Sequence, residues 1–328
     1  MRENYEIKMK KLFKIINKSI TIFCLLVLII NNVYGQNSSL KFKVTAITEN
    51  VYSIVSPYKG LPTPENKGWN SNSHFVITKN GVILFDTGSS ETIGNKIKVA
   101  IKSVTNQPVR WVVNSHSHAD HWLGNSAFKD AEFITTKDAL LTMKKYGKDD
   151  LKFYSKVTKG TIGNTQLKYP TTILTNEQKR NLGGIDVEFI FSNNGHSPGD
   201  ILMWLPKQKI IFGGDVLSSD WMPMISNYKN ISNLINFLNN VVKLNPIIIL
   251  TGHGKATTIK SIKRDAELLS SVRNLVNKEY QKGKTLNNTL YEVKLKLKVK
   301  FQFLYKDFDS EVERHIKIMY RLLNREKS

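Results

Sequence analysis

The sequence contains a single cysteine among its 328 residues, and this residue, Cys24, lies in an apolar run near the start of the chain. A folded domain that follows this run has no cysteine for a disulfide bond, and a zinc site built on thiolates is excluded. Any metal site must therefore use histidine and carboxylate ligands. Histidine is also scarce, with seven residues in the whole chain.

A long apolar run of the length that a membrane span needs is also missing. The apolar run at residues 20–30 is about eleven residues long, whereas a spanning helix needs about 20. It follows a lysine-rich segment at 8–18 and is followed by Gly35 and Gln36, an order that is typical of a secretory signal peptide. We therefore expect residues 1–35 to be removed and the protein to be secreted, to the periplasm, without a stable membrane anchor. An uncleaved anchor is the alternative.

Acidic residues are few, with 27 Asp and Glu against 48 Lys and Arg, so the formal net charge is +21. Such a charge can attract nucleic acid, anionic lipid or anionic substrates. The lysines are spread singly along the chain, however, and no basic motif interleaved with aromatic residues occurs. We expect a small-molecule substrate and no nucleic acid, and the sequence leaves the oligomeric state open.

Short apolar runs and longer segments of helical period alternate from residue 41 onward. Strands are predicted at 44–47, 51–55, 74–78, 81–85, 111–113, 133–135, 187–191, 201–205, 209–212 and 246–250. Helices are predicted at 92–104, 137–146, 231–242, 259–278 and 311–324. This alternation predicts an α/β fold in which helices cover mixed sheets.

Two segments do not fit the alternation. Residues 144–180 are polar, lysine-rich and poorly periodic, which predicts an insertion on the surface. Residues 56–73 form a long turn-rich loop, and such loops are often functional. The expected organisation is a signal peptide at 1–35, a catalytic domain at 36–258 and a C-terminal helical extension at 259–328.

The strongest chemical signal is the segment N-S-H-S-H-A-D-H, which directly follows the apolar run at 111–113. It places His116, His118, Asp120 and His121 within six residues. Imidazoles and carboxylates are costly to bury alone, whereas a divalent cation binds both well. On an extended segment His116 and His118 point to the same side, and a turn lets Asp120 and His121 face a second metal.

Three further motifs place a metal-binding side chain at or after the end of an apolar run. They are G-H-S-P-G-D with His196, G-G-D with Asp215, and G-H-G with His253. The neighbouring glycines permit tight turns, so strand-end loops can converge on one rim. Two histidines fall outside these motifs, His74 and His315, and we expect them to be ordinary core or surface residues.

Taken in order, these motifs resemble those of the metallo-β-lactamase superfamily, and so does the D-T-G at 86–88. The resemblance implies a four-layer αββα sandwich with two zinc ions at one edge. The implied ligands of the first zinc are His116, His118 and His196, and those of the second are Asp120, His121 and His253. Asp215 would bridge the two ions, and Asp86 would brace the ligand loop.

Within the superfamily, the bridging Asp215 resembles glyoxalase II, lactonases and secreted hydrolases linked to quinoprotein and sulfur-oxidation systems. The run at 201–206 resembles true β-lactamases instead, but the similar β-lactamase subclass has cysteine in place of Asp215 and lysine in place of Ser218. The resemblance implies a dinuclear zinc hydrolase of ester, thioester or lactone bonds, in which a metal-bridging hydroxide attacks and Asp120 orients it. A secreted β-lactamase and a low-turnover periplasmic accessory or binding protein are the alternatives, and iron or manganese could replace zinc.

The sequence does not specify the substrate. Aromatic and methionine side chains near the ligand motifs are the candidates for the substrate pocket. They are Trp69, Trp122, Trp221, Met222, Met224 and Tyr228.

Overall fold

The computed structural model describes residues 40–58, 60–192, 195–225 and 231–327. The chain divides into two compact units, and the fold discussed below is that of residues 42–328. The expected signal peptide lies outside the described residues. Among the helices that are described, none is both long enough and apolar enough to cross a membrane.

The first sheet has seven strands in sequence order. They are β1 (Val44–Ala46), β2 (Val51–Ile54), β3 (Ser73–Thr78), β4 (Gly81–Phe85), β5 (Val109–Val113), β6 (Glu132–Thr136) and β7 (Thr172–Leu174). The strands from β1 to β4 pair antiparallel, and those from β4 to β7 pair parallel. Strands β4 and β5 therefore end at the same edge of the sheet.

The second sheet has five strands in the order β12-β11-β10-β9-β8. They are β8 (Gln178–Leu182), β9 (Ile185–Ser192), β10 (Asp200–Leu205), β11 (Ile210–Gly214) and β12 (Ile248–Thr251). Strands β11 and β12 are parallel, and β10 is antiparallel to both β9 and β11. It follows that β9, β11 and β12 all run in the same direction.

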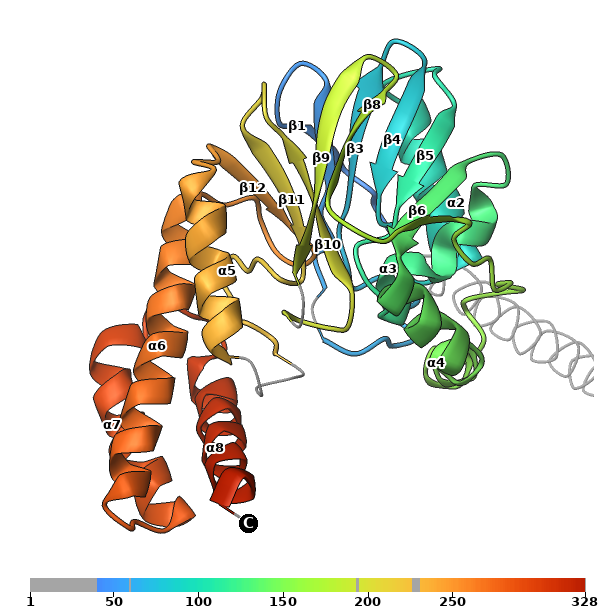
Figure 1. Ribbon diagram of the computed structural model, residues 1–328. Helices are drawn as coiled ribbons and strands as arrows, with labels where there is room; N and C mark the ends of the chain where they lie inside the picture. Colours follow the sequence, from blue (N-terminus) through green and yellow to red (C-terminus); the bar gives the residue numbers. More distant parts are fainter. Residues whose placement is uncertain (1–39, 59, 193–194, 226–230, 328) are drawn as a thin grey trace, which may run out of the picture. The chain divides into compact units, whose positions relative to one another are not determined.

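The two sheets pack face to face, and helices cover their outer faces (Figure 1). Phe85, Phe189, Phe212 and Leu250 are buried between the sheets. Helix α2 (Glu91–Lys102) lies on the side of the first sheet and begins at Ser90, whose side chain accepts a hydrogen bond from the Ile93 amide. Helices α5 (Ile231–Lys243) and α6 (Ile259–Gln281) lie on the side of the second sheet. The predicted four-layer αββα sandwich is confirmed.

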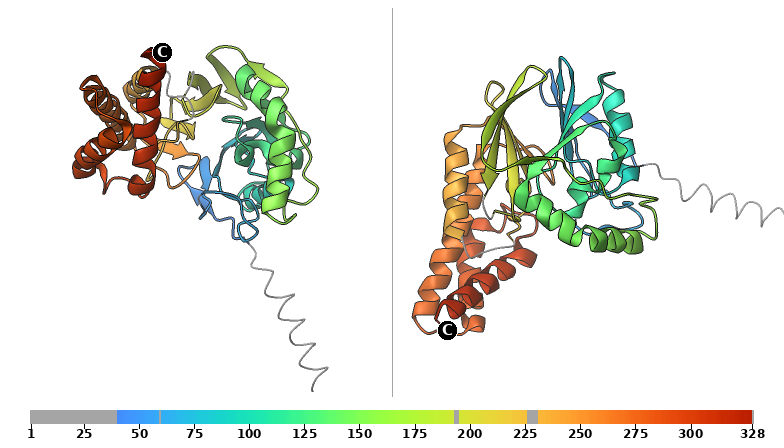
Figure 2. Two further views of the ribbon diagram at one scale, coloured as in Figure 1. Left: turned by 90° about the horizontal axis from the view of Figure 1, so that it is seen from below. Right: turned by 45° about the vertical axis from the view of Figure 1, so that its right-hand side comes forward.

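The C-terminal helices α6, α7 (Leu286–Phe301) and α8 (Phe308–Lys327) pack together beside α5 (Figure 2). Helix α7 was not predicted, because Leu and Lys alternate along it with the period of a strand. On a helix this alternation divides the apolar side chains between two faces. Val293 and Leu297 are buried, whereas Leu295 and Val299 are exposed.

The prediction that residues 144–180 form a surface insertion is wrong. Helix α4 runs over Lys137–Val157, and the side chain of Tyr154 in its last turns is buried. The rest of the segment supplies β7 and part of β8, which are edge strands of the two sheets. Edge strands and half-exposed helices carry many polar residues, which hid their period in the sequence.

Two short helices follow β5 and precede β6. They are α3 (Ala119–Trp122) and η1 (Leu123–Ala127). Helix α3 carries two of the expected ligands, Asp120 and His121.

Candidate metal centre

All of the expected ligands lie at one edge of the sandwich, because the strands that precede them end there. His116 to His121 follow β5, His196 follows β9, Asp215 follows β11 and His253 follows β12. The ligand atoms form two groups, and within each group they lie within 4.8 Å of one another. One group is His116, His118, His196 and Asp215, and the other is Asp120, His121 and His253.

Asp215 faces histidines of both groups. Its Oδ2 atom lies 3.5 Å from Nε2 of His196 and 3.2 Å from Nε2 of His253. Its Oδ1 atom lies 3.4 Å from Nε2 of His121. A carboxylate in this position can contact cations in both groups, which is the arrangement expected of a bridging ligand.

Three buried ligand atoms in this cluster have no hydrogen-bond partner. They are Nε2 of His116, Nε2 of His121 and Oδ1 of Asp215. An unpartnered buried polar atom is costly, and three of them in one cluster indicate a partner that is not part of the chain. Neutral imidazole and carboxylate are good donors to zinc and to other divalent cations, so the residues fit a metal pair.

The opposite ring nitrogen of four ligand histidines is held by the protein. Nδ1 of His116 lies 2.8 Å from Ser115 Oγ, and Nδ1 of His121 lies 2.8 Å from Asp86 Oδ2. Nδ1 of His196 lies 2.6 Å from the Met224 carbonyl, and Nδ1 of His253 lies 2.7 Å from the Asn70 carbonyl. The carbonyls and the Asp86 carboxylate can only accept, and the Ser115 hydroxyl already donates to Asp86. Nδ1 therefore carries the proton in all four rings, and Nε2 is left as the metal-binding atom. The exception is His118, whose Nδ1 lies 2.7 Å from Nε2 of His196. Its Nδ1 is therefore the atom that faces the cluster.

Asp86 connects two parts of the ligand loop, as the resemblance implied. Its carboxylate accepts hydrogen bonds from the amide and hydroxyl of Ser115, both at 2.7 Å, and from Nδ1 of His121 at 2.8 Å. Its backbone has a φ of +63°, a left-handed conformation that aspartate adopts more readily than most residues. This strained turn aims the carboxylate from the end of β4 at the loop after β5.

The charges of the cluster favour cation binding. Burial lowers the pKa of His116 well below its ordinary value, and burial together with His196 lowers the pKa of His118 to about 4. Burial alone would also lower the pKa of His121, but the carboxylates of Asp215, Asp120 and Asp86 outweigh it and raise this pKa to about 10. The first group therefore offers neutral imidazoles, and the carboxylates attract positive charge beside His121.

Gly252 shows why the G-H-G motif needs its first glycine. A Cβ atom at this position would collide with the carboxylate of Asp215 and with the ring of His121. The Gly252 amide also donates to the Gly214 carbonyl at 2.6 Å, which fixes the end of β12 against the end of β11.

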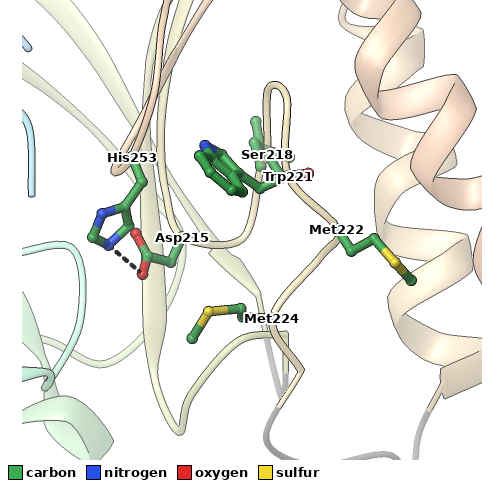
Figure 3. Close-up of a pocket in the computed structure, with 7 residues that line it drawn as sticks. Asp215, Ser218, Trp221, Met222, Met224 and His253 are labelled. Carbon is green, nitrogen blue, oxygen red and sulfur yellow. Dashed lines mark ion pairs between the residues drawn. The ribbon is translucent and has the colours of Figure 1, made fainter. Parts of the chain in front are cut away.

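Two adjoining cavities open beside the ligands, and Asp215, Met224 and His253 line both. The larger has a volume of about 250 Å³, and its lining includes the ligands His118 and Asp120. Its remaining wall consists of Gly60, Leu61, Pro62, Asn70, Phe153 and Tyr154. The smaller is lined in addition by Leu217, Ser218, Trp221 and Met222 (Figure 3).

The structure separates the pocket candidates proposed from the sequence. Trp221, Met222 and Met224 line a cavity, whereas Tyr228 lies outside the described residues. Trp122 and Trp69 line neither cavity, so their assignment to the pocket is corrected. Trp122 is fully buried beneath α4 and stacks on Tyr169, and Trp69 is buried and stacks on Phe42.

Several cavity residues were missed from the sequence. Phe153 and Tyr154 lie on the part of α4 that was taken for an insertion, so no signal pointed to them. Leu61, Pro62 and Asn70 belong to the turn-rich loop at 56–73, whose length was the available signal. The carboxylate of Asp200 accepts from the His196 and Ser197 amides, and its place at the end of the G-H-S-P-G-D motif could have indicated this role.

The comparisons agree with this geometry. A family model described as "Metallo-beta-lactamase superfamily" matches residues 66–253, which is more than half of the chain and includes all seven ligand residues. The chain belongs to the metallo-β-lactamase superfamily. The subtype within the superfamily is not fixed by this match.

Two similar proteins carry the names of different activities. Metallo-β-lactamase IND-1 from Chryseobacterium indologenes is 28% identical over 163 residues, covering 50% of this chain and 61% of IND-1. An alkyl/aryl-sulfatase from Saccharomyces cerevisiae is 23% identical over 197 residues, covering 50% of this chain and 29% of the yeast protein. The chain thus spans less than two thirds of either relative.

A solved structure matches part of the helical extension as well. The inverting sec-alkylsulfatase Pisa1 from Pseudomonas sp. aligns with a TM-score of 0.63 and 13% identity, over 85% of this chain and 50% of that chain. An alignment of this extent is longer than residues 1–258, so it takes in part of the C-terminal helices. At this identity the match shows a shared fold.

Proposed function

We propose that the protein is a secreted, dinuclear zinc hydrolase that cleaves an ester, thioester or lactone bond next to an apolar group. The observation that carries this proposal is the composition of the larger cavity. Leu61, Pro62, Phe153 and Met224 form an apolar wall of the cavity that the ligands also line. Among the described lining residues of both cavities there is no lysine or arginine. Such a wall favours a neutral, apolar substrate portion.

Each side chain of the cluster has a role in this reaction. His116, His118 and His196 would hold one cation, Asp120, His121 and His253 the other, and Asp215 would contact both. When bound, two zinc ions would supply a hydroxide near neutral pH and polarise the scissile carbonyl. The Asp120 carboxylate lines the larger cavity, where it can orient the attacking water and accept its proton. That proton then passes to the leaving oxygen or sulfur.

The site lacks the lysine that the similar β-lactamase subclass has in place of Ser218. Ser218 stands at the position expected to carry a lysine for the carboxylate of the drug. Its hydroxyl donates to Asp265 at 2.5 Å and is therefore already engaged. This supports β-lactamase activity less than it supports hydrolysis of neutral substrates.

A sulfuric ester with an alkyl chain is the second candidate substrate. The similarity to the yeast alkyl/aryl-sulfatase favours it, and the apolar wall would accept an alkyl chain equally well. The absence of a described basic side chain for the sulfate group counts against it.

A hydrolase panel on the zinc-loaded protein tests the proposal. It should contain p-nitrophenyl acetate and butyrate, an acyl thioester, a γ-lactone, nitrocefin and a secondary alkyl sulfate. We expect turnover of an ester, thioester or lactone that exceeds turnover of nitrocefin. Preferred hydrolysis of nitrocefin or of the sulfate would replace our proposal by that activity. Inertness to every compound at full zinc loading would favour an accessory or binding role.

Secretion to the periplasm is part of the same proposal, and it is supported by the order of residues 8–36. Mass spectrometry of the exported protein should find a mature chain that begins near Gln36. A cytoplasmic protein that retains residues 10–30 would contradict it.

A further inference from the structure

One loop connects the metal centre with both cavities. This cavity loop, residues 216–224, begins directly after Asp215 and contributes Trp221 and Met224 to the cavity linings. At its end the Met224 carbonyl lies 2.6 Å from Nδ1 of His196. The loop is thus attached to the metal centre at both ends, by a ligand at its start and by the support of a ligand at its end.

The C-terminal helices also hold this loop. The turn between α7 and α8, residues 302–307, is called the brace turn here. The Lys306 amide donates to the Asp220 carbonyl at 2.8 Å, and the Lys306 ammonium lies 2.6 Å from the Asp220 carboxylate. The Met222 amide donates to Oδ1 of Asp307 at 2.8 Å.

A buried carboxylate on α6 adds a third attachment. Asp265 accepts a hydrogen bond from the Ser218 hydroxyl at 2.5 Å and another from the Tyr305 hydroxyl at 2.8 Å. Its side chain is 3% exposed. One carboxylate therefore joins the cavity loop, the brace turn and helix α6.

Apolar contacts also attach the cavity loop to the C-terminal helices. Figure 3 shows Trp221 and Met224 beside Asp215, whereas Met222 points toward the helices. Met222 is 1% exposed and belongs to the apolar cluster that α5 to α8 form. The loop consequently lines the cavities and is also embedded in the C-terminal helices, with Met222 contributing to both.

We infer that the C-terminal helices determine the substrate range of this site, because the brace turn and Asp265 fix the cavity loop and thereby the position of Trp221 and Met224. The brace residues act through the loop and contact no substrate themselves. They are positioning residues. This inference rests on the proposed hydrolysis at the same site.

Residues 216–224 form no helix or strand. Without these attachments such a loop would sample several positions, and each would present a different cavity wall. Because the cavity loop is held at Ser218, Asp220 and Met222, it keeps a single position. The brace should therefore affect substrate binding and acyl-chain preference more than the reaction at the metal centre.

Hydrogen–deuterium exchange on the full-length mature protein tests the brace without depending on any activity. Asp307→Ala removes the acceptor of the Met222 amide. We expect amide exchange in residues 216–224 to accelerate by roughly tenfold, while strands β9 to β12 keep the exchange rates of the wild type. Asp307→Asn keeps an acceptor oxygen and should restore slow exchange.

Glu313→Ala is the matched control. It also removes a carboxylate from the C-terminal helices, where Glu313 pairs with Lys294 and Lys317, but it does not touch the loop. Unchanged exchange in the loop of Asp307→Ala would overturn the inference. So would equal acceleration in Glu313→Ala, or acceleration throughout the sheets, because both indicate general destabilisation.

Kinetics on p-nitrophenyl butyrate provide the second readout. Asp307→Ala should raise KM at least about threefold with kcat within about twofold of the wild type and with unchanged zinc content. A fall in kcat at constant KM would contradict the positioning role. If the wild type does not hydrolyse this ester, the proposed function is wrong for this substrate. The exchange experiment still decides whether the brace turn holds the cavity loop.

Discussion

At the scale of single residues, the metal centre depends on how each ligand is held from behind. Met224 and Asn70 use backbone carbonyls, Ser115 a hydroxyl and Asp86 a carboxylate. Carbonyls tolerate substitution of their side chains, whereas Asp86 and Ser115 act through their side chains. Substitution of Asp86 should therefore lower the affinity for the metals, whereas substitution of the Met224 side chain should not.

Replacing Asp215 by asparagine tests its position between the two ligand groups. The change keeps the shape and removes the charge that faces His121, His196 and His253. One zinc should bind far more weakly, and hydrolysis of an accepted ester or lactone should fall by at least roughly a hundredfold. Metal analysis and kinetics on the same preparation check both. Full zinc loading with normal activity would contradict the bridging role.

Asp86→Asn tests whether the Asp86 carboxylate supports the metal-binding loop after β5. Asparagine also tolerates the left-handed backbone found at this position, so the fold should persist. Loss of the charge that holds His121 and Ser115 should weaken zinc affinity by roughly 10- to 100-fold, as measured by competition with a chelating dye. The control is Asp186→Asn, which changes an exposed aspartate that pairs with Lys207. Equal zinc affinity in both variants would show that Asp86 has no such role.

At the scale of elements, the alternation of apolar residues and lysines in α7 is compatible with a strand or with a helix, and the two differ in which side chains are buried. As a strand, its alternating residues Leu295, Leu297 and Val299 would share a face. As a helix, they do not: Leu297 is 1% exposed, whereas Val299 is 82% exposed. Leu297→Ala should cost about 2–5 kcal/mol of unfolding free energy, and Val299→Ala less than about 0.5 kcal/mol. Urea denaturation measures both, and equal losses would contradict the helix.

His315 on α8 gives the helical extension a pH dependence. Burial lowers its pKa to about 3, so the folded chain stays neutral where the unfolded chain takes up a proton. The unfolded state therefore binds more protons between about pH 6.5 and pH 3, and stability falls as the pH falls through this window. Thermal melts from pH 7 to pH 4 should show a smaller loss in His315→Gln than in the wild type. Parallel curves would contradict the assignment.

Element by element, the sequence predicted what short-range patterns encode. The ligand motifs follow strand ends, and strand direction alone brings them to one edge, so the cluster could be predicted from the order of strands and motifs along the chain. Trp122 shows the limit: it follows His121 directly, but on α3 the two side chains diverge, and its ring enters the core. Helix α7 and residues 144–180 were missed because their polarity pattern depends on which face the rest of the molecule covers.

At the scale of the whole molecule, we infer that the sandwich and the C-terminal helices act together at the site. The sheets collect the ligands at one edge, and the helices hold the loop that lines the cavities beside them. Residues 259–328 belong to the same compact unit as the sandwich. The net charge of +21 does not enter this account, because no described lining residue of the two cavities is a lysine or an arginine.

The central claim is that this edge of the sandwich holds two cations, and metal stoichiometry tests it most directly. Elemental analysis of protein purified without chelator and reconstituted with zinc should find close to two zinc ions per chain. Asp215→Asn, measured in parallel, should retain about one. Iron or manganese at the same stoichiometry would change the identity of the metal and leave the site intact. A wild-type protein that reproducibly binds no metal, or no more than the Asp215→Asn variant, would contradict the account.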